Sequence, residues 1–159
     1  MTLSTTLKVG DKAPEFSLPA STGGEQISLK DQAGKKVVLY FYPKDDTPGC
    51  TKEACGFRDA NADLTKAGAV VLGINVDKMR SHTKFARKLN LNFSLLSDED
   101  KKVSTAYGAW GEKSMYGRAY MGIYRMTFLI DEHGKIQEIW PNVKPEGHAQ
   151  EILTLLRTG

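Results

Sequence analysis

The sequence of 159 residues predicts an α/β fold with a mixed central sheet. Two apolar runs, 37–42 and 69–74, have the length and the β-branched or aromatic composition of buried strands. A helical segment lies between them, and this strand–helix–strand order predicts parallel pairing with a right-handed connection. Two later runs, 127–130 and 135–140, are separated by a short turn and predict an antiparallel hairpin. Strands of both kinds, interleaved with helices, indicate a mixed sheet.

The first elements have clear sequence signals. Residues 9–29 are predicted to form an N-terminal hairpin region, with Gly23 and Gly24 as its turn. The helix after strand 37–42 has Thr47 as a possible N-cap, Pro48 at the first helical position and Gly68 at its end. Four apolar residues at helical spacing predict its buried face: Phe57, Ala60, Leu64 and Ala67.

The remaining segments continue the alternation. We expect a helix over 81–89, a short strand over 93–96, a short helix over 99–107 and a last helix over about 145–157. The stretch 110–124 is rich in Gly, Met and Tyr and shows no clear periodicity, so it is predicted to be a structured loop.

Composition limits the class of protein. The length fits one domain spanning residues 1–159, and 40% hydrophobic with 26% charged residues excludes a disordered or fibrous chain. The 22 basic and 19 acidic residues are interspersed, so no nucleic-acid partner is expected. No apolar run is long enough to cross a membrane, the first eight residues do not resemble a signal peptide, and two cysteines do not make a disulfide scaffold. These features predict a cytoplasmic protein that does not bind membranes.

No metal site or cofactor is expected. Structural zinc uses four Cys or His ligands in close pairs, whereas this chain has two cysteines and three scattered histidines. We expect His82, His133 and His148 at the surface or in turns. A Cys–His catalytic pair stays open, although no local signature supports it. Neither a serine-hydrolase elbow nor a phosphate-binding glycine motif is present.

The most informative stretch is 42–55, where a strand's carboxyl end leads into a helix. With Thr47 as the N-cap, Cys50 is the third helical residue. The early N–H groups of a helix have no intrahelical acceptor, and the helix dipole favours a thiolate there. The N–H groups of Gly49 and Cys50 and the Thr47 hydroxyl are candidate donors to a substrate, so a reactive Cys50 is predicted.

The spacing of the two cysteines adds a constraint. Five residues of α-helix separate Cα atoms by about 8.7 Å, whereas a disulfide requires less than about 7 Å. Cys50 and Cys55 therefore either never pair or pair after the first helical turns unwind. Gly49 and Gly56 weaken the helix and favour unwinding.

The pattern Pro43-x-x-x-Thr47-x-x-Cys50 resembles the signature of the peroxiredoxins. The residues Tyr-Phe-Tyr-Pro-Lys at 40–44, and the second cysteine five positions after Cys50, are similar to the bacterioferritin-comigratory, or peroxiredoxin Q, branch. The similarity extends over most of the chain, at segments 10–14, 95–98, 107–113 and 125–131.

This resemblance implies a thioredoxin-like fold and thiol-dependent reduction of hydrogen peroxide and organic hydroperoxides. It implies that Cys50 is the peroxidatic cysteine, that Thr47 hydrogen-bonds the peroxide and that Pro43 shields the pocket. Arg125 would pair with the thiolate and orient the O–O bond, for which its permanently charged fork is suited.

The resemblance also implies that Cys55 resolves the oxidised Cys50 in an intramolecular disulfide, reduced by thioredoxin or a glutaredoxin-like dithiol protein. Glu53 matches an acid frequent in the branch, and Trp110 is a candidate for the pocket border. The branch is often monomeric, so a monomer is expected.

Two other functions compete with this reading. A thioredoxin-like disulfide oxidoreductase is disfavoured, because such enzymes hold their cysteines two residues apart. A redox-regulated holdase would need exposed apolar surface, and the sequence shows no evident patch.

Overall fold

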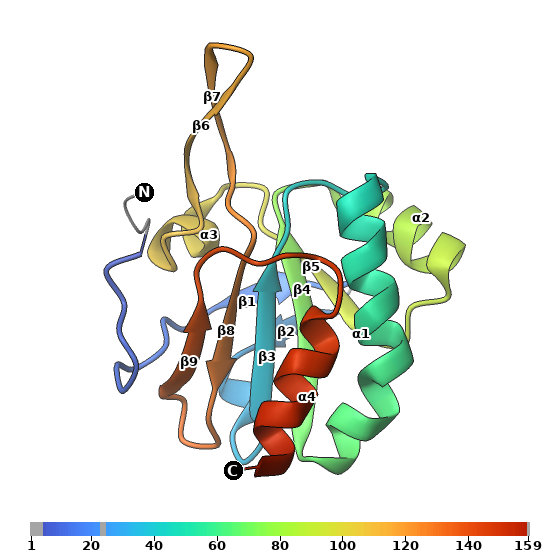
Figure 1. Ribbon diagram of the computed structural model, residues 1–159, viewed down its shortest axis with the longest axis vertical. Helices are drawn as coiled ribbons and strands as arrows, with labels where there is room; N and C mark the ends of the chain where they lie inside the picture. Colours follow the sequence, from blue (N-terminus) through green and yellow to red (C-terminus); the bar gives the residue numbers. More distant parts are fainter. Residues whose placement is uncertain (1–4, 23–24, 159) are drawn as a thin grey trace.

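The computed structural model describes residues 5–22 and 25–158. A five-stranded mixed sheet with the order β5-β4-β3-β8-β9 forms its centre (Figure 1). The strands are β3 (Lys36–Phe41), β4 (Ala69–Asn75), β5 (Ser94–Ser97), β8 (Met126–Ile130) and β9 (Ile136–Trp140). β3, β4 and β5 pair in parallel, whereas β8 is antiparallel to both β3 and β9. The predicted mixed α/β fold is confirmed.

The helices are α1 (Pro48–Lys66), α2 (Met79–Leu89), α3 (Lys102–Ala106) and α4 (His148–Thr158), and a short 3-10 turn, η1, spans Lys30–Gln32. α1 and α2 begin and end close to the predicted limits. α3 and α4 each begin three residues later than expected, so 99–101 and 145–147 belong to the preceding connections. No helix of the described ranges is both long enough and apolar enough to span a membrane.

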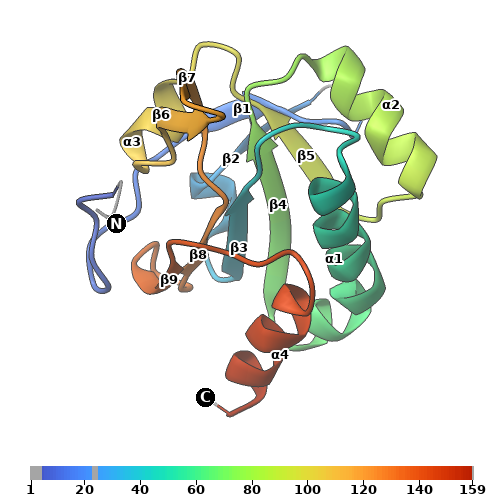
Figure 2. The same ribbon diagram turned by 45° about the horizontal axis from the view of Figure 1, so that its top comes forward.

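Alternate residues of β3 enter two core clusters on opposite faces of the sheet, as the period of a strand requires. Val38 and Tyr40 pack against the helices, which contribute Phe57, Leu64, Phe85, Ile152 and Leu153. Val37, Leu39 and Phe41 face the other layer, with Leu18, Leu29 and Tyr107. Figure 2 shows α1, α2 and α4 on one side of the sheet and the N-terminal hairpin on the other. This layering explains why β3 is apolar at every position after Lys36.

The N-terminal hairpin consists of β1 (Ser17–Pro19) and β2 (Gln26–Ser28), which pair antiparallel. Its existence was predicted within 9–29. The predicted turn at Gly23 and Gly24 lies outside the described residues.

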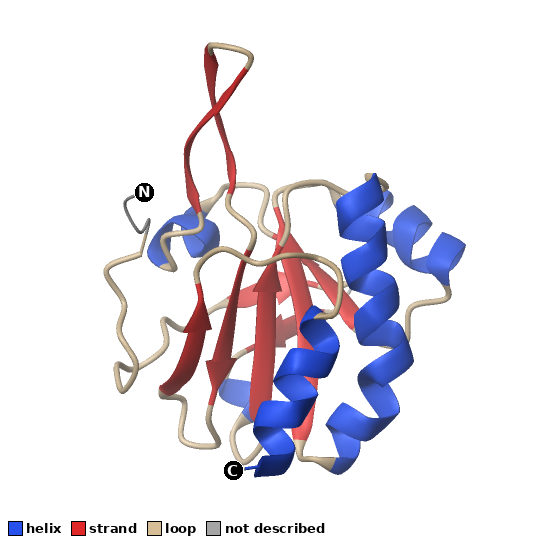
Figure 3. Cartoon of the chain, viewed as in Figure 1, coloured by secondary structure: helices blue, strands red, loops and turns tan. Residues whose placement is uncertain are grey.

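The prediction of a loop over 110–124 is wrong. β6 (Trp110–Met115) and β7 (Arg118–Ile123) form an antiparallel hairpin that projects away from the main sheet (Figure 3). Most of its residues are exposed or half-buried, so no alternation of apolar and polar residues reveals the strands. Tyr116 and Gly117 connect them with φ of 54° and 77°, the positive values of a type I′ hairpin turn.

The expectation that all three histidines lie at the surface or in turns is also wrong for two of them. His82 and His148 are buried. His148 Nε2 lies 2.8 Å from the Thr127 hydroxyl on β8, and its Nδ1 lies 2.9 Å from Glu151. Because each buried ring has polar partners on other segments, the local sequence alone does not reveal its burial.

Candidate active site

The loop from Tyr42 to Thr47 joins the carboxyl end of β3 to the start of α1. Asp46 in this loop has a φ of 59°, a left-handed conformation that turns the chain toward the helix. Cys50 is the third residue of α1, as expected, and its side chain is buried. The loop and the first helical turn thus place a buried sulfur at the edge of the sheet where α/β folds carry their sites.

Thr47 occupies the N-cap position, but its side chain does not cap the helix. The hydroxyl instead donates to the Lys44 carbonyl at 2.9 Å. The predicted side-chain cap is therefore wrong, whereas the predicted helix start is confirmed. The first helical bond runs from the Thr51 N–H to the Thr47 carbonyl at 2.8 Å, so the N–H groups of Gly49 and Cys50 precede the repeating helical bonds.

Arg125 lies directly before β8, whose pairing with β3 aligns Met126 with Phe41. This register brings the guanidinium to the start of α1. Its Nη2 donates to Cys50 Sγ at 3.4 Å, and its Nη1 donates to Glu53 Oε1 at 2.7 Å. Burial alone would lower the pKa of Arg125, but the neighbouring Cys50 and Glu53 raise it. The side chain is thus a permanent cation between a sulfur and a carboxylate.

Glu53 follows Cys50 by three residues and therefore lies on the same face of α1. It is buried, and desolvation raises its pKa to about 7 even though Arg125 acts to lower it. Its Oε2 is buried without a hydrogen-bond partner among the described residues. The carboxyl group consequently changes protonation near neutral pH while it contacts the guanidinium.

Gly49 lets the guanidinium approach the backbone closely, because a Cβ at this position would lie 3.2 Å from Arg125 Nη2 and 3.5 Å from Pro145 Cγ. A surface hollow of about 520 Å³ adjoins this point. It is lined by Pro48, Gly49, Lys52, Lys144, Pro145 and Glu146.

The other predicted site residues lie at different distances from this centre. Pro43 is half-buried in the loop, and Cys55 is half-buried farther along α1; both cysteines are free thiols. Trp110 begins β6, packs against the core and has the Lys101 ammonium 5.4 Å above its ring.

Two neighbours of the site were not predicted. The pKa of the Lys113 ammonium on β6 is lowered by burial and then by Arg125, with Cys50 acting in the opposite direction. The pKa of Tyr40 on β3 is raised by burial, then by Glu53 and Cys50. Both pKa shifts depend on residues that are distant in the sequence. Only Tyr40 could have been noticed in the sequence, because it places a phenol in an apolar strand.

Together these features describe a buried sulfur at a helix N-terminus that accepts a hydrogen bond from a cationic guanidinium. The chain matches the AhpC/TSA family over residues 9–139. It belongs to this family of peroxiredoxins.

Two relatives support the assignment over nearly the whole chain. A putative peroxiredoxin of Coxiella burnetii is 56% identical over 147 residues, covering 92% of this chain and 97% of the relative. Peroxiredoxin Bcp of Escherichia coli is 51% identical, covering 95% and 96%. Both carry names of the branch expected from the motif, and this chain is a thiol-dependent peroxidase.

Solved structures agree. Peroxiredoxin Q of Xanthomonas campestris superposes with a TM-score of 0.87 at 39% identity, covering 98% of each chain. A mutant of the Xylella fastidiosa enzyme gives a TM-score of 0.91 at 35% identity, covering 97% of this chain and 98% of that one. The predicted thioredoxin-like fold and peroxiredoxin Q branch are thereby confirmed.

The buried Glu53 generates a pH-dependent prediction. The pKa of Glu53 in the folded protein is about 7, above its ordinary value of 4.5. Its contribution to the free energy of unfolding is therefore complete below pH 4.5 and is lost as the pH rises through 7. Replacing Glu53 by Gln removes this titration and keeps an oxygen for Arg125. The unfolding free energy of Glu53→Gln, relative to wild type, should therefore rise between about pH 5 and pH 8, by at most about 3 kcal/mol.

Urea unfolding at a series of pH values measures this difference. A difference that stays constant over the whole range would contradict the predicted burial of an ionisable Glu53.

Proposed function

We propose that Cys50 is the peroxidatic residue of this peroxiredoxin and attacks hydrogen peroxide or an organic hydroperoxide as a thiolate. A sulfur–oxygen bond forms as the O–O bond breaks, which gives Cys50 sulfenic acid. The departing hydroxide or alkoxide takes one proton and leaves as water or alcohol. The observation that carries this proposal is the 3.4 Å contact between Arg125 Nη2 and Cys50 Sγ.

The same guanidinium is suited to bind the peroxide. Its fork presents several N–H groups, and those not engaged by Glu53 can donate to an oxygen placed beside the sulfur. The N–H groups of Gly49 and Cys50 lie at the same helix start. The Thr47 hydroxyl, whose proton goes to the Lys44 carbonyl, can accept a hydrogen bond from the peroxide. Donors fixed before the reaction stabilise charge that develops on the departing oxygen. Pro43, half-buried in the same loop, would shield the pocket from water.

Glu53 would act through Arg125 rather than on the peroxide. Its Oε1 contact at 2.7 Å fixes one side of the guanidinium, and this orients the other side toward the sulfur. Trp110 is proposed only as a border of the pocket, where its packed ring would support the base of the β6–β7 hairpin.

Cys55 is proposed as the resolving residue. Its thiolate would attack the Cys50 sulfenic sulfur, forming the disulfide as the S–O bond breaks. The departing hydroxide would take one proton and leave as water. Both cysteines lie within the continuous helix α1, so the first turns must open before their sulfurs can bond. This constraint also disfavours a direct thioredoxin-like disulfide exchange as the main activity.

A dithiol protein of the thioredoxin or glutaredoxin kind would then reduce the disulfide. We place the reaction in the cytoplasm, where such reductants keep thiols reduced. We further propose that the 159 residues act as one domain and as a monomer. A solved relative from Xanthomonas campestris is described in connection with alkyl peroxide reduction, which supports organic hydroperoxides as substrates.

Two cysteine variants test the assigned roles. Cys50→Ser should abolish peroxide consumption, because no other residue is proposed to attack the O–O bond. Cys55→Ser should consume one equivalent of peroxide and then stop in the presence of thioredoxin. Rapid mixing followed by mass analysis of the thiols measures both. Normal peroxide consumption by Cys50→Ser would overturn the assignment.

A glycine variant tests the opening of α1. A Cβ at Gly56 would meet Ala149 Cβ at 3.8 Å, an ordinary contact, so Gly56→Ala should stabilise the helix by about 1 kcal/mol. Disulfide formation should slow by about fivefold, while the oxidation rate of Cys50 stays unchanged.

Thr65→Ala is the matched control, because Thr65 is an exposed position of the same helix far from the cysteines. It should leave the rate of disulfide formation unchanged. Equal rates in wild type and Gly56→Ala would show that helix opening does not limit the reaction.

A further inference from the structure

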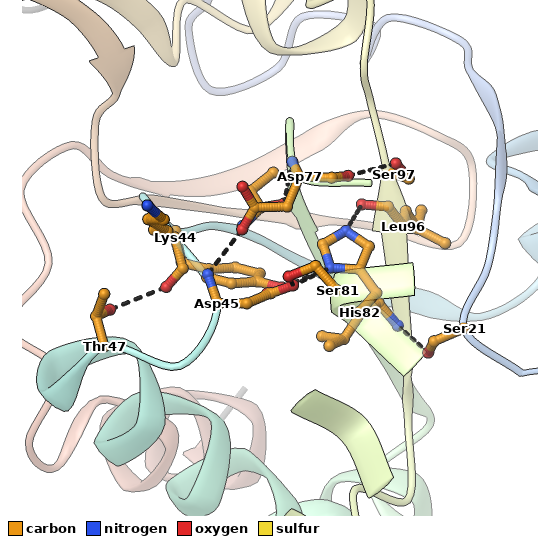
Figure 4. Close-up of polar contacts among 12 residues, drawn as sticks. Ser21, Lys44, Asp45, Thr47, Asp77, Ser81, His82, Leu96 and Ser97 are labelled. Atoms are coloured by element: carbon orange, nitrogen blue, oxygen red, sulfur yellow. Dashed lines mark hydrogen bonds and ion pairs between the residues drawn. The ribbon is translucent and has the colours of Figure 1, made fainter. Parts of the chain in front are cut away.

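The loop between β3 and α1 contains a buried carboxylate, Asp45, whose side chain lies against Ser81 and His82 of α2 (Figure 4). Three side chains contact it. The Tyr42 hydroxyl donates to Oδ1 at 2.6 Å, the Ser81 hydroxyl donates to Oδ2 at 2.8 Å, and His82 Nδ1 lies 2.6 Å from Oδ2. The thiol chemistry proposed above uses none of these four residues.

The imidazole of His82 has an acceptor on each side. Its Nδ1 faces the Asp45 carboxylate, and its Nε2 lies 2.9 Å from the Leu96 carbonyl of β5. A carbonyl and a carboxylate only accept hydrogen bonds, and a neutral imidazole has a single N–H. Both acceptors are satisfied only when each ring nitrogen carries a proton, which would make His82 and Asp45 a buried ion pair.

The titratable groups around this pair come from three segments. Tyr42 at the end of β3 has its pKa raised well above the ordinary value by burial and then by Asp45, so it remains a donor. Burial alone would raise the pKa of Asp45, but the hydrogen bond and charge of His82 outweigh it and hold the pKa below its ordinary value. Asp77, after β4, accepts the Asp45 N–H at 2.8 Å, and β5 presents the Leu96 carbonyl.

These contacts join the active-site loop to α2 and β5. Asp45 lies two residues before Thr47 and five before Cys50, so its position sets where the first turn of α1 begins. A side chain without an N–H on each side cannot donate to both acceptors. Either the Asp45 carboxylate or the Leu96 carbonyl then loses its partner inside the protein, which is costly for a buried polar group.

We propose that His82 is a positioning residue for the peroxide reaction: as an imidazolium it holds Asp45, fixes the 43–47 loop and keeps the first turn of α1 closed around Cys50. This inference rests on the roles proposed for Cys50 and Cys55. Attack on peroxide needs the closed turn, whereas disulfide formation needs it open. The contacts of His82 thus favour attack, and their loss favours resolution.

The protonation state is tested on the reduced wild-type protein. Nitrogen NMR of the histidine rings should show two N–H groups on His82 at neutral pH. A single N–H at neutral pH would overturn the proposal, whatever the variants do.

Amide hydrogen exchange of residues 43–55 in the reduced protein tests the positioning role. His82→Gln removes the charge and should accelerate exchange in this segment by about tenfold. Lys88→Gln is the matched control. Lys88 Nζ on α2 lies 2.7 Å from Asp46 Oδ1 of the same loop, in an exposed ion pair. Removing this pair should change the exchange rate by less than about twofold.

Asp45→Asn and the double variant separate positioning from simple destabilisation. If His82 acts through Asp45, adding His82→Gln to Asp45→Asn should have much less effect than adding it to wild type. Additive effects, or equal exchange in wild type and His82→Gln, would contradict the proposal.

Rapid mixing with hydrogen peroxide gives the functional result. At neutral pH, His82→Gln should oxidise Cys50 more slowly than wild type and should form the disulfide faster. Equal rates of both steps in wild type and variant would overturn the role of His82. If Cys50 of the wild type were not oxidised, the proposed function would be contradicted instead. Hydrogen exchange would still test whether His82 positions the loop.

Discussion

The site is organised around the guanidinium of Arg125, which lies between the sulfur of Cys50 and the carboxyl group of Glu53. Two features of the fold make this contact possible. The antiparallel register of β8 on β3 places Arg125 at the edge of the sheet where α1 starts. The three-residue spacing of Cys50 and Glu53 turns both side chains toward it. Because all three groups are largely buried, their electrostatic interactions are stronger than they would be in water.

Burial of charge also restricts the first turn of α1. A reactive Cys50 benefits from a closed turn that directs free N–H groups at the substrate, yet the same turn keeps Cys55 out of reach. In the proposed cycle, the chain would therefore alternate between a closed and an opened helix start. The loop with Asp45 would have to move, and its buried partners on α2 and β5 would determine how readily it does so.

The sequence predicted the parts of the molecule that local patterns control. The β3–α1–β4 unit follows from two apolar runs around a helix marked by Pro48 and Gly68, and the place of Cys50 follows from the helix start. The β6–β7 hairpin was missed, because strands exposed on both faces carry no alternating pattern. Its turn also uses Tyr116, a residue that rarely adopts a positive φ.

Contacts between distant segments were the other limit. Arg125 and Glu53 lie 72 residues apart, and the motif suggested the arginine without revealing its carboxylate partner. His82 and Asp45 are separated by 37 residues, so nothing local distinguished His82 from a surface histidine. Such pairs depend on the register of the sheet and the packing of α2, which a single sequence does not specify.

The role of Arg125 is tested by the second-order rate constant for Cys50 oxidation by hydrogen peroxide at neutral pH in folded Arg125→Lys. Lysine keeps the charge but lacks the fork that reaches both the sulfur and Glu53. We expect this rate constant to fall by at least about a hundredfold. A variant that reacts at the wild-type rate would show that the guanidinium contact does not organise the site.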